Sequence, residues 1–208
     1  MDEGRAILFD LTPLNKVLDA DREVRTWLVI RHGQKAPAEA GVPFEEIPLS
    51  PQGMADSKKL GNELKASGIH ILHLSSSPLS RCLATGKYLL EGLGSVNYIH
   101  KEDILAYPGS FLADGTLKGV PTVGVRNVLK LVTAAPSHGR TIGLAITHDA
   151  VIAPILTYLT GESYDLAGKW IDPLDGFALI EKDGLWKVVD HGRSTEVTPL
   201  ICSAISGP

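Results

Sequence analysis

Three short predicted strands, each followed at once by polar residues, constrain the fold of this chain more than any other feature. They are 27–30, which is apolar, partly β-branched and expected to be buried, 69–74, and the second buried strand 141–146. A helix signal follows each strand along the chain. Alternating strands and helices are typical of an α/β domain with a largely parallel sheet. We therefore expect a three-layer α/β/α fold with a mostly parallel central sheet.

The helix signals come from serine, proline and glycine. Ser50 before Pro51 predicts a helix that runs to about residue 66, and Ser77 before Pro78 predicts one to about residue 90. Residues 1–23 are mixed in character and are expected to form an exposed lead-in. The remaining expected elements are a short strand at 96–99, helices at 123–135 and 149–159, and a late hairpin with strands at 177–181 and 186–189.

The length of 208 residues is that of one domain, so we expect a single domain over residues 1–208. Glycines and prolines interrupt residues 101–121, which predicts a long irregular excursion. Long loops in compact domains are often functional. The stretch around 101–121 is therefore expected to be a substrate-facing insert.

Charge and cysteine content exclude several classes of protein. Lys and Arg number 20 against 24 Asp and Glu, a net charge of −4, and no basic run is present, so nucleic acid is not an expected partner. The apolar stretch around 142–159 falls short of the roughly 18 uncharged residues of a membrane span. The acidic start differs from a signal peptide. Cys82 and Cys202 are too few for a disulfide framework or a thiolate metal site. We expect a cytoplasmic protein without a membrane partner.

Charged and histidine side chains follow the predicted strands. In parallel sheets the carboxyl ends of the strands meet at one edge, where ligands bind. Residues separated widely in the sequence are thereby expected to form one cluster at that edge. Arg31 and His32 follow the first strand, and His148 and Asp149 follow the last strand of the parallel set. Arg81 lies one helical turn beyond the residues that follow the second strand.

These residue types suit phosphoryl transfer. His32 is the candidate nucleophile, because a histidine with a pKa near 6.5 is largely neutral at pH 7. Arg31 and Arg81 are candidate phosphate ligands, because the planar guanidinium matches phosphate oxygens. His148 is expected to donate to the phosphoryl group. Asp149 is a candidate proton donor, although an aspartate at a helix start is more commonly a cap.

The motifs that contain these residues resemble the histidine phosphatase superfamily, also called the phosphoglycerate mutase-like fold. They occur in the order of that family within residues 27–159. Four motifs in order, each in a strand–loop–helix context, are far more specific than any one of them. The motifs are Arg31-His32-Gly33, the segment 49–53, the segment 76–81 with Ala84-Thr85, and Thr147-His148-Asp149.

The compact length resembles the mutase and small-phosphatase branch of the family, whereas the motifs lean toward the acid phosphatase branch. In the latter the first motif reads Arg-His-Gly-x-Arg-x-Pro. Pro37 matches this pattern, but Lys35 stands where that branch has arginine. Lysine keeps the charge and loses the bidentate fork. Lys35 is thus a candidate phosphate ligand on weaker grounds than the arginines, with an exposed loop lysine as the alternative.

The proton donor also separates the branches. The acid phosphatase branch uses the aspartate of a His-Asp pair, which Asp149 matches. The mutase-like branch uses a glutamate beyond the arginine helix, and our rough alignment places Ala106 there. Glu102 and Asp103 lie nearby and remain reserve candidates for the donor.

The resemblance implies a metal-independent phosphomonoester hydrolase that acts on a small phosphorylated metabolite. His32 would form a phosphohistidine while Asp149 protonates the leaving alcohol, and water would then release inorganic phosphate. Arg31, Arg81 and a protonated His148 would hold the phosphoryl oxygens. The resemblance implies no cofactor and no metal. Three alternatives remain: a mutase-like phosphotransferase, a phosphoprotein or phosphohistidine phosphatase, and a catalytically inactive phosphate-binding module.

The acidic residues of the loop after the first motif bear on substrate choice. Glu39, Glu45 and Glu46 are expected to form a solvated loop face. If that face borders the site, its charge disfavours polyanionic substrates such as inositol polyphosphates.

Overall fold

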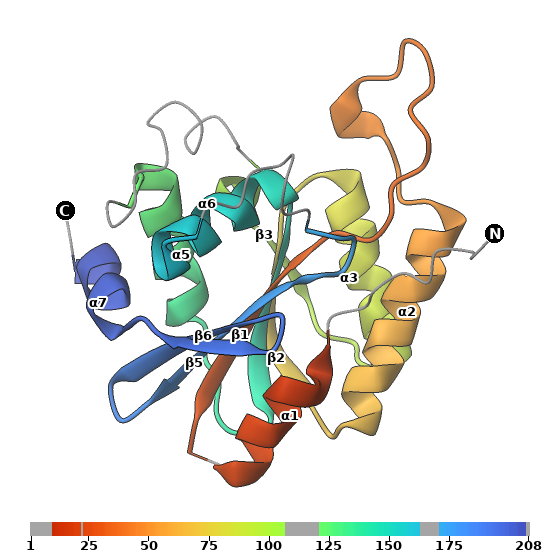
Figure 1. The fold of residues 1–208 in the computed structure, drawn as a ribbon. Coiled ribbons are helices and arrows are strands. Elements are labelled where there is room, and N and C mark those ends of the chain that lie inside the picture. The colour runs from red at the N-terminus through yellow and green to blue at the C-terminus, as the bar shows by residue number, and fades with distance from the viewer. Residues whose placement is uncertain (1–9, 22, 107–120, 163–170, 207–208) are drawn as a thin grey trace.

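One mixed sheet forms the centre of the computed structural model, which describes residues 10–21, 23–106, 121–162 and 171–206 (Figure 1). Its strand order is β3-β2-β4-β1-β5-β6-β7. The first four of these pair in parallel, and β5 to β7 add antiparallel strands beside β1. The strands are β1 Arg25–Arg31, β2 His70–Ser76, β3 Ile99–Lys101, β4 Thr141–Thr147, β5 Gly176–Lys182, β6 Leu185–Asp190 and β7 Arg193–Glu196.

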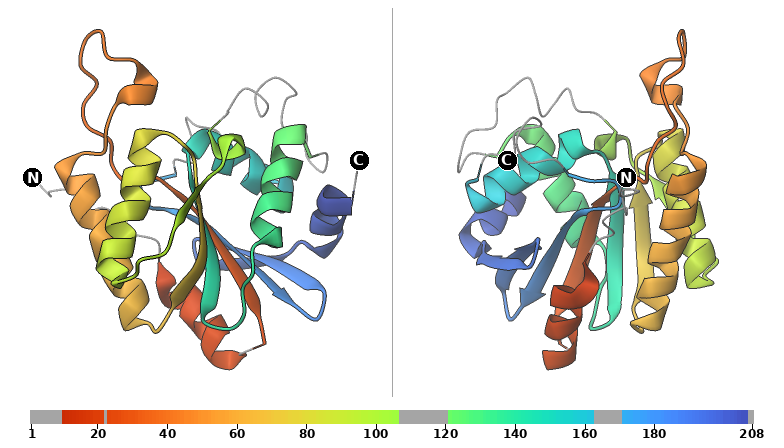
Figure 2. Two further views of the ribbon diagram at one scale, coloured as in Figure 1. Left: turned by 180° about the vertical axis from the view of Figure 1, so that it is seen from behind. Right: turned by 45° about the vertical axis from the view of Figure 1, so that its right-hand side comes forward.

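Helices cover both faces of the sheet, which confirms the predicted α/β/α layers (Figures 1 and 2). One layer holds α1 Leu11–Ala20, α2 Pro51–Ala66 and α3 Ser80–Leu93, and the other holds α5 Val123–Ala134, α6 Asp149–Thr160 and α7 Thr198–Ser206. Two short 3-10 helices, η1 Phe44–Glu46 and η2 Asp103–Leu105, lie in the connections. The sheet itself is mixed rather than mostly parallel, because the late hairpin pairs with β1.

The alternation of side chains along β1 explains why this strand is central. Trp27 and Val29 pack into the apolar core beneath α5 to α7, whereas Leu28 and Ile30 pack into the core beneath α1 to α3. Successive side chains of a strand point to opposite faces, so a strand that is buried on both faces is apolar throughout. The last residue of this buried strand is Arg31, which is thereby held rigidly at the carboxyl edge.

Local signals set several helix ends as predicted. The Ser50 hydroxyl accepts the N–H of Gly53 at 3.0 Å at the start of α2, and Gly161 ends α6 in the left-handed region with φ 71°. The predicted start at Ser77 is wrong, because α3 begins at Ser80. The Ser77 hydroxyl instead accepts the N–H of Leu79 and lies 3.0 Å from a ring nitrogen of His148.

The predicted exposed lead-in is also wrong. Residues 11–20 form α1, whose start is capped by the Asp10 carboxylate on the N–H of Thr12 at 2.9 Å. Leu14 and Leu18 are one turn apart on this helix and are buried in the core shared with α2 and α3. The strand predicted at 96–99 is β3, which lies at 99–101. The strand β7 and the helix α7 were not predicted. Residues 107–120 of the predicted insert lie outside the described residues.

Two glycines allow α2 and α3 to pack with their backbones in contact. A Cβ atom on Gly61 would lie 2.1 Å from the Leu89 carbonyl oxygen, and one on Gly92 would lie 2.0 Å from that of Lys58. Neither distance is possible for a real side chain, so both positions require glycine. The close packing fixes α3, and with it the residues at its first turn, against α2 and the sheet.

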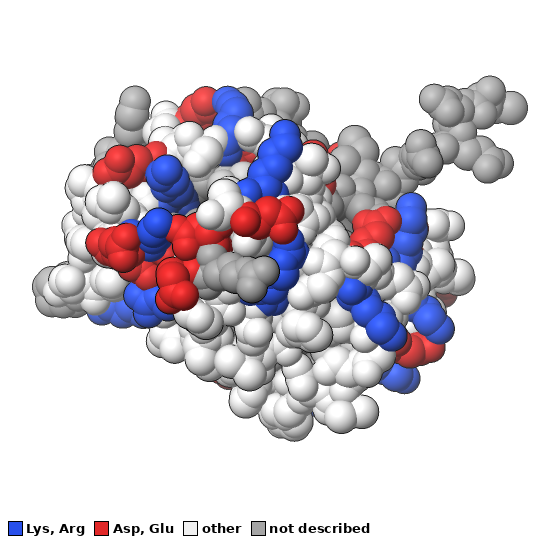
Figure 3. All heavy atoms as spheres, turned by 90° about the horizontal axis from the view of Figure 1, so that it is seen from below, with Lys and Arg blue, Asp and Glu red and all other residues white. Residues whose placement is uncertain are grey.

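Acidic and basic side chains are interspersed over the described residues of the face drawn in Figure 3. Among the described helices, none is both long enough and apolar enough to cross a membrane.

Candidate active site

The predicted cluster forms at the carboxyl ends of β1 and β4. Arg31 at the end of β1 pairs with Thr147 at the end of β4, and the N–H of His32 donates to the Thr147 carbonyl at 2.9 Å. The first turn of α3 brings Arg81 to the same place, where its Nε lies 3.1 Å from Nε2 of His32. The rings of His32 and His148 are 5.2 Å apart between centroids. Three of the predicted side chains therefore meet, as the strand-end argument requires.

Hydrogen bonds assign the tautomer of His32. Its Nδ1 lies 2.7 Å from the carbonyl oxygen of Gly33, which can only accept, so Nδ1 carries the proton. Its Nε2 accepts from Nε of Arg81. Burial and the neighbouring His148 and arginines lower the pKa of His32 to about 2. His32 is therefore neutral at physiological pH, with the Nε2 lone pair directed into the cluster.

Arg81 is a buried cation with an unusual set of partners. Its side chain is 1% exposed, and Nη1 donates to the carbonyls of Phe44 at 3.0 Å and Glu45 at 3.5 Å. No carboxylate among the described residues makes an ion pair with it. A buried charge without a counterion is costly unless a ligand supplies one. The arrangement favours a bound anion beside Arg81 and His32.

His148 is held by its other neighbours in the opposite tautomer. Nη2 of Arg81 lies 3.5 Å from Nδ1, which must accept from a guanidinium, so Nε2 donates to the Ser77 hydroxyl at 3.0 Å. Burial and the charge of Arg81 lower the pKa of His148 to about 4. The side chain is thus neutral near pH 7, in contrast to the protonated form expected from the resemblance. A bound phosphoryl dianion would favour the protonated form.

Cys82, which follows Arg81, completes the surroundings of His148. Its sulfur lies 3.6 Å from Nε2 of His148 and 3.6 Å from the carbonyl of Thr147. Burial raises the pKa of this thiol to about 12. The cysteine is therefore a protonated packing residue and not a nucleophile.

Arg31 connects the cluster to Asp149. Its Nη2 lies 3.1 Å from a carboxylate oxygen of Asp149, and its Nη1 donates to the carbonyl of Ile171 at 2.5 Å. The backbone of Arg31 is held as well, since its N–H donates to Asp175 at 2.8 Å and its carbonyl accepts from Leu174 at 3.2 Å. The turn 171–175 before β5 thus fixes Arg31 from the side opposite to β4.

Asp149 is not the N-cap residue of α6, although its carboxylate still accepts one N–H of the first helical turn. His148 occupies the N-cap position of α6, and Asp149 is the first residue of the helix. One carboxylate oxygen accepts from the N–H of Ala150 at 2.8 Å, and the other faces Arg31. Asp149 is therefore directed into the cluster.

Glu102 and Asp103, the reserve candidates, lie farther along the sheet edge. Glu102 follows β3, which is separated from β1 by β4 and β2, a backbone distance of about 14 Å at normal strand spacing. Its N–H donates to Ser76 at 2.9 Å, and Asp103 is exposed at the start of η2. Asp149 is the better placed of the three carboxylates.

Lys35 lies at the mouth of the cluster. Its Nζ is 4.2 Å from the centroid of the Phe44 ring, and its backbone pairs with Leu49 in an isolated bridge. Burial and the nearby charges of Arg81 and Arg31 lower its pKa. Lys35 is thus close enough to Arg31 and Arg81 to feel their charge, as a third cation at the site would be.

Sequence reasoning did not assign three residues that shape the site. Thr85 accepts the N–H of Gly33 at 2.9 Å, Ser77 orients His148, and Phe44 contributes its carbonyl and ring to Arg81. Thr85 and Ser77 lie within the quoted motifs, so their positions carried a signal. Nothing in the sequence marks Phe44.

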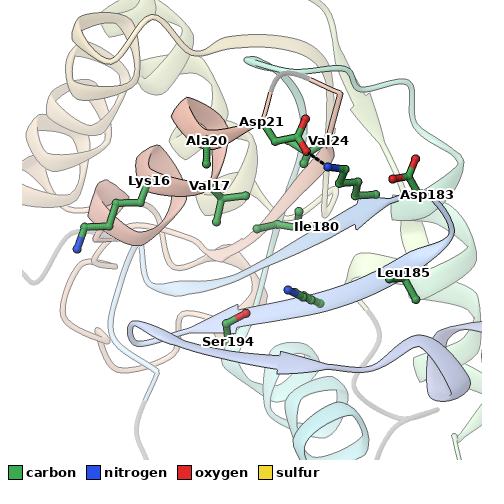
Figure 4. A pocket seen from close by; sticks show the side chains of 11 residues that line it. Lys16, Val17, Ala20, Asp21, Val24, Ile180, Asp183, Leu185 and Ser194 are labelled. Atoms are coloured by element: carbon green, nitrogen blue, oxygen red, sulfur yellow. Dashed lines mark ion pairs between the residues drawn. The ribbon is translucent and has the colours of Figure 1, made fainter.

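A separate groove lies at the other end of the sheet (Figure 4). It has a volume of about 550 Å³, lies between α1 and the β5–β6 hairpin, and has Val17, Val24, Ile180 and Leu185 along its wall. An ion pair between Asp21 and Lys182 crosses its rim. Since β1 begins at this end, its length of roughly 20 Å separates the groove from the histidine cluster. Among the described residues, no group of three or more His, Cys, Asp or Glu side chains is arranged to hold a metal ion.

The two depressed histidine pKa values predict an acid-sensitive fold. Each histidine titrates near 6.5 in the unfolded chain, but His32 does so only near about 2 and His148 near about 4 in the folded one. Below pH 6.5 the unfolded chain therefore binds more protons, and the free energy of unfolding falls by up to about 1.4 kcal/mol per histidine for each pH unit. Urea unfolding between about pH 7.5 and about pH 5 measures this slope.

A matched pair of variants separates this effect from general acid sensitivity. His148→Asn removes one of the two buried histidines, so its slope is expected to be smaller than that of the wild type. His70→Asn changes an exposed histidine and serves as the control. An unchanged slope in His148→Asn would contradict the assignment.

Comparison with known proteins agrees with the motifs. Residues 27–105 match the model of the histidine phosphatase superfamily (branch 1), which confirms the resemblance read from the sequence. The match is to branch 1, so it lends no support to the leaning toward the acid phosphatase branch. The matched range includes His32 and Arg81 but ends before His148. No curated protein that was compared matches the chain.

Solved structures share the phosphoglycerate mutase-like fold. Phosphoglycerate mutase from Bacillus anthracis str. Sterne is 15% identical, with a TM-score of 0.55 over 89% of this chain and 99% of that one. The protein histidine phosphatase SixA complexed with tungstate is 18% identical, with a TM-score of 0.52 over 82% and 93%. Ecdysone phosphate phosphatase from Bombix mori, also with tungstate, is 14% identical, with a TM-score of 0.53 over 81% and 93%.

Proposed function

We propose that this protein hydrolyses phosphomonoesters of small metabolites. The premise is that residues 27–105 match the histidine phosphatase superfamily and that the chain has the phosphoglycerate mutase-like fold. The observation that carries the proposal is the buried Arg81, which has no carboxylate partner among the described residues and donates to Nε2 of His32. An anion site that touches a neutral imidazole is what transfer of a phosphoryl group to histidine requires.

His32 is the nucleophile of the first step. The Nε–H of Arg81 moves from Nε2 of His32 to a phosphoryl oxygen of the substrate. The freed Nε2 lone pair then attacks phosphorus in line, the N–P bond forms and the ester O–P bond breaks. Because Nδ1–H is bound to the Gly33 carbonyl, the ring is oriented before substrate arrives and does not have to lose a proton. Arg31, Arg81 and Lys35 supply fixed positive charge for the phosphoryl oxygens, a role that a metal ion plays in other enzymes.

Asp149 is proposed to act as the general acid of the first step and the general base of the second. It gives a proton to the leaving oxygen in the first step, and as a carboxylate it accepts one from the water that attacks the phosphohistidine in the second. Its ion pair with Arg31 links this role to substrate binding. The phosphoryl group takes over the guanidinium, and the proton that Asp149 passes to the leaving oxygen enters with the substrate monoanion.

His148 is proposed to bind the phosphoryl group opposite Arg81. Its side chain is neutral near pH 7, with Nε2 bound to Ser77. The incoming dianion draws a proton to Nδ1, the atom that faces Arg81. His148 then donates to a phosphoryl oxygen, in agreement with the role that the resemblance implies.

Asp149→Asn tests the reaction class. We expect little change in kcat/KM with a nitrophenyl phosphate, whose leaving group needs no proton, and a loss of about a hundredfold or more in kcat/KM with an alkyl phosphate. The measurement is kcat/KM, which reports the phosphorylation step, for a series of esters with leaving groups of increasing basicity, with a chelator present throughout. Asp183→Asn, in the turn at the opposite end of the sheet, is the matched control.

The outcomes of this experiment distinguish the alternatives. An equal loss in kcat/KM for good and poor leaving groups would refute the acid role of Asp149. Phosphate binding without turnover of any ester would identify an inactive binding module. Loss of the wild-type activity on chelation, restored by added metal, would refute metal independence.

A further inference from the structure

The short helix η1 lies against the anion-binding arginine. Both Phe44 and Glu45 give their backbone carbonyls to Nη1 of Arg81, at 3.0 Å and 3.5 Å. Figures 1 and 2 show the segment that carries η1 standing out beyond the carboxyl ends of the strands, before α2. The two hydrogen bonds tie this protruding segment to the site, so its side chains border the path by which a leaving group must enter.

The ring of Phe44 gives this border an apolar surface. The guanidinium carbon of Arg81 lies 4.7 Å from the ring centroid, and Nζ of Lys35 lies 4.2 Å from it. The two cations hold the ring in place through cation–π contacts. Even so, Phe44 is 56% exposed. A large apolar side chain that is both fixed and exposed beside an anion site is suited to contact the organic part of a ligand.

The remaining residues of η1 give the border negative charge. Glu45 and Glu46 are both exposed. Burial is the largest effect on Arg81 and lowers its pKa, while the carboxylates of Asp149 and Glu45 act in the opposite direction. Positive charge is therefore carried by Arg31 and Arg81 beside the histidines and by Lys35, and the carboxylates of η1 add negative charge at the entrance.

We propose that η1 selects phosphomonoesters whose leaving group is apolar and carries no negative charge. The inference rests on the proposed phosphatase function and names the class of substrate for that site. The phosphoryl group reaches Arg31 and Arg81, and the leaving group contacts the Phe44 ring. A second anionic group on the substrate would lie near Glu45 and Glu46 and be repelled. Sugar bisphosphates and phosphorylated carboxylic acids are poor substrates on this account.

The expected selectivity follows from Coulomb's law. Two like charges about 8 Å apart near a solvated surface disfavour binding by about two- to sixfold for each pair. The carboxylates of Glu45 and Glu46 act together, so we expect wild-type kcat/KM for phenyl phosphate to exceed that for (carboxymethyl)phenyl phosphate by about fivefold or more. Added salt is expected to reduce this ratio, since exposed charges are screened.

The charge arm of the test compares three variants on those two esters. Glu45→Gln is expected to lower the selectivity ratio at least about twofold, and Glu46→Gln is expected to lower it in the same direction. Glu39→Gln removes the same charge from the same loop but from outside η1, and should leave the ratio unchanged. A wild-type ratio near one, or equal ratios in Glu45→Gln and Glu39→Gln, would overturn the proposal.

The apolar arm uses Phe44. Phe44→Ala is expected to raise KM for phenyl phosphate about fivefold and to change KM for methyl phosphate far less, whereas Phe44→Tyr should restore the wild-type values. Equal effects on both esters would overturn the contact with the leaving group. If the enzyme turns over esters but shows neither the charge preference nor the apolar preference, the inference about η1 is refuted and the proposed function stands. Absence of turnover with every ester refutes the proposed function as well.

Discussion

Replacing His32 with alanine is expected to reduce kcat by at least about a thousandfold while the protein stays folded. The nucleophile cannot be replaced by a neighbour, because the other ring, His148, directs Nε2 to Ser77 and has only Nδ1 toward the site. Removal of a covalent nucleophile typically leaves only the contribution of binding and charge stabilisation. Steady-state hydrolysis of an aryl phosphate measures the loss.

The control for this variant is phosphate or vanadate binding. His32→Ala retains Arg31, Arg81 and Lys35, so its affinity for these anions should fall far less than kcat. Circular dichroism and urea unfolding establish that the fold is intact. Activity within about tenfold of the wild type, in a folded variant, would contradict the nucleophile assignment.

Replacing Arg81 with lysine is expected to lower kcat/KM by about a hundredfold, although the charge is kept. The guanidinium donates in three directions, through Nε to His32, through Nη2 toward His148 and through Nη1 to the Phe44 carbonyl. A lysine supplies a single ammonium and cannot keep these contacts together with two phosphoryl oxygens. Loss of one preorganised donor in an enclosed site costs about a hundred- to thousandfold.

Arg25→Lys is the matched control for this substitution. Arg25 starts β1, at the end of the strand remote from the site, and pairs with Glu181 at 2.5 Å. Its replacement should change kcat/KM by less than about twofold, because a half-exposed ion pair contributes little. Retention of kcat/KM within about threefold in Arg81→Lys would contradict a role for the planar fork.

Much of the site was predictable because parallel strands bring their carboxyl ends together. Arg31 and His148 are more than a hundred positions apart, yet each follows an apolar run, and the register of β1 with β4 pairs Arg31 with Thr147, the residue before His148. The same reasoning placed Arg81 one helical turn beyond β2. These predictions depended on local patterns and one topological rule, and the structure brings the three residues together.

The features that could not be predicted depend on contacts between distant segments. The turn 171–175 holds Arg31 through backbone groups, and backbone hydrogen bonds leave no mark in side-chain patterns. Phe44 reaches Arg81 from a loop whose path the sequence does not fix. The burial that makes His148 neutral likewise appears only when α3 and β4 are packed together. The mixed sheet follows from pairing of β5 with β1, which the hairpin signal did not specify.

The most direct test of the central claim is to identify the phosphorylated atom. Rapid quenching of wild-type enzyme with a labelled aryl phosphate, followed by peptide mapping and phosphorus NMR, reports the residue and the ring nitrogen. The account predicts acid-labile, base-stable phosphate on Nε2 of His32, formed fast enough to account for kcat and absent from His32→Ala. Turnover without such an intermediate, phosphate on another residue, or phosphate on Nδ1 of His32 would contradict it.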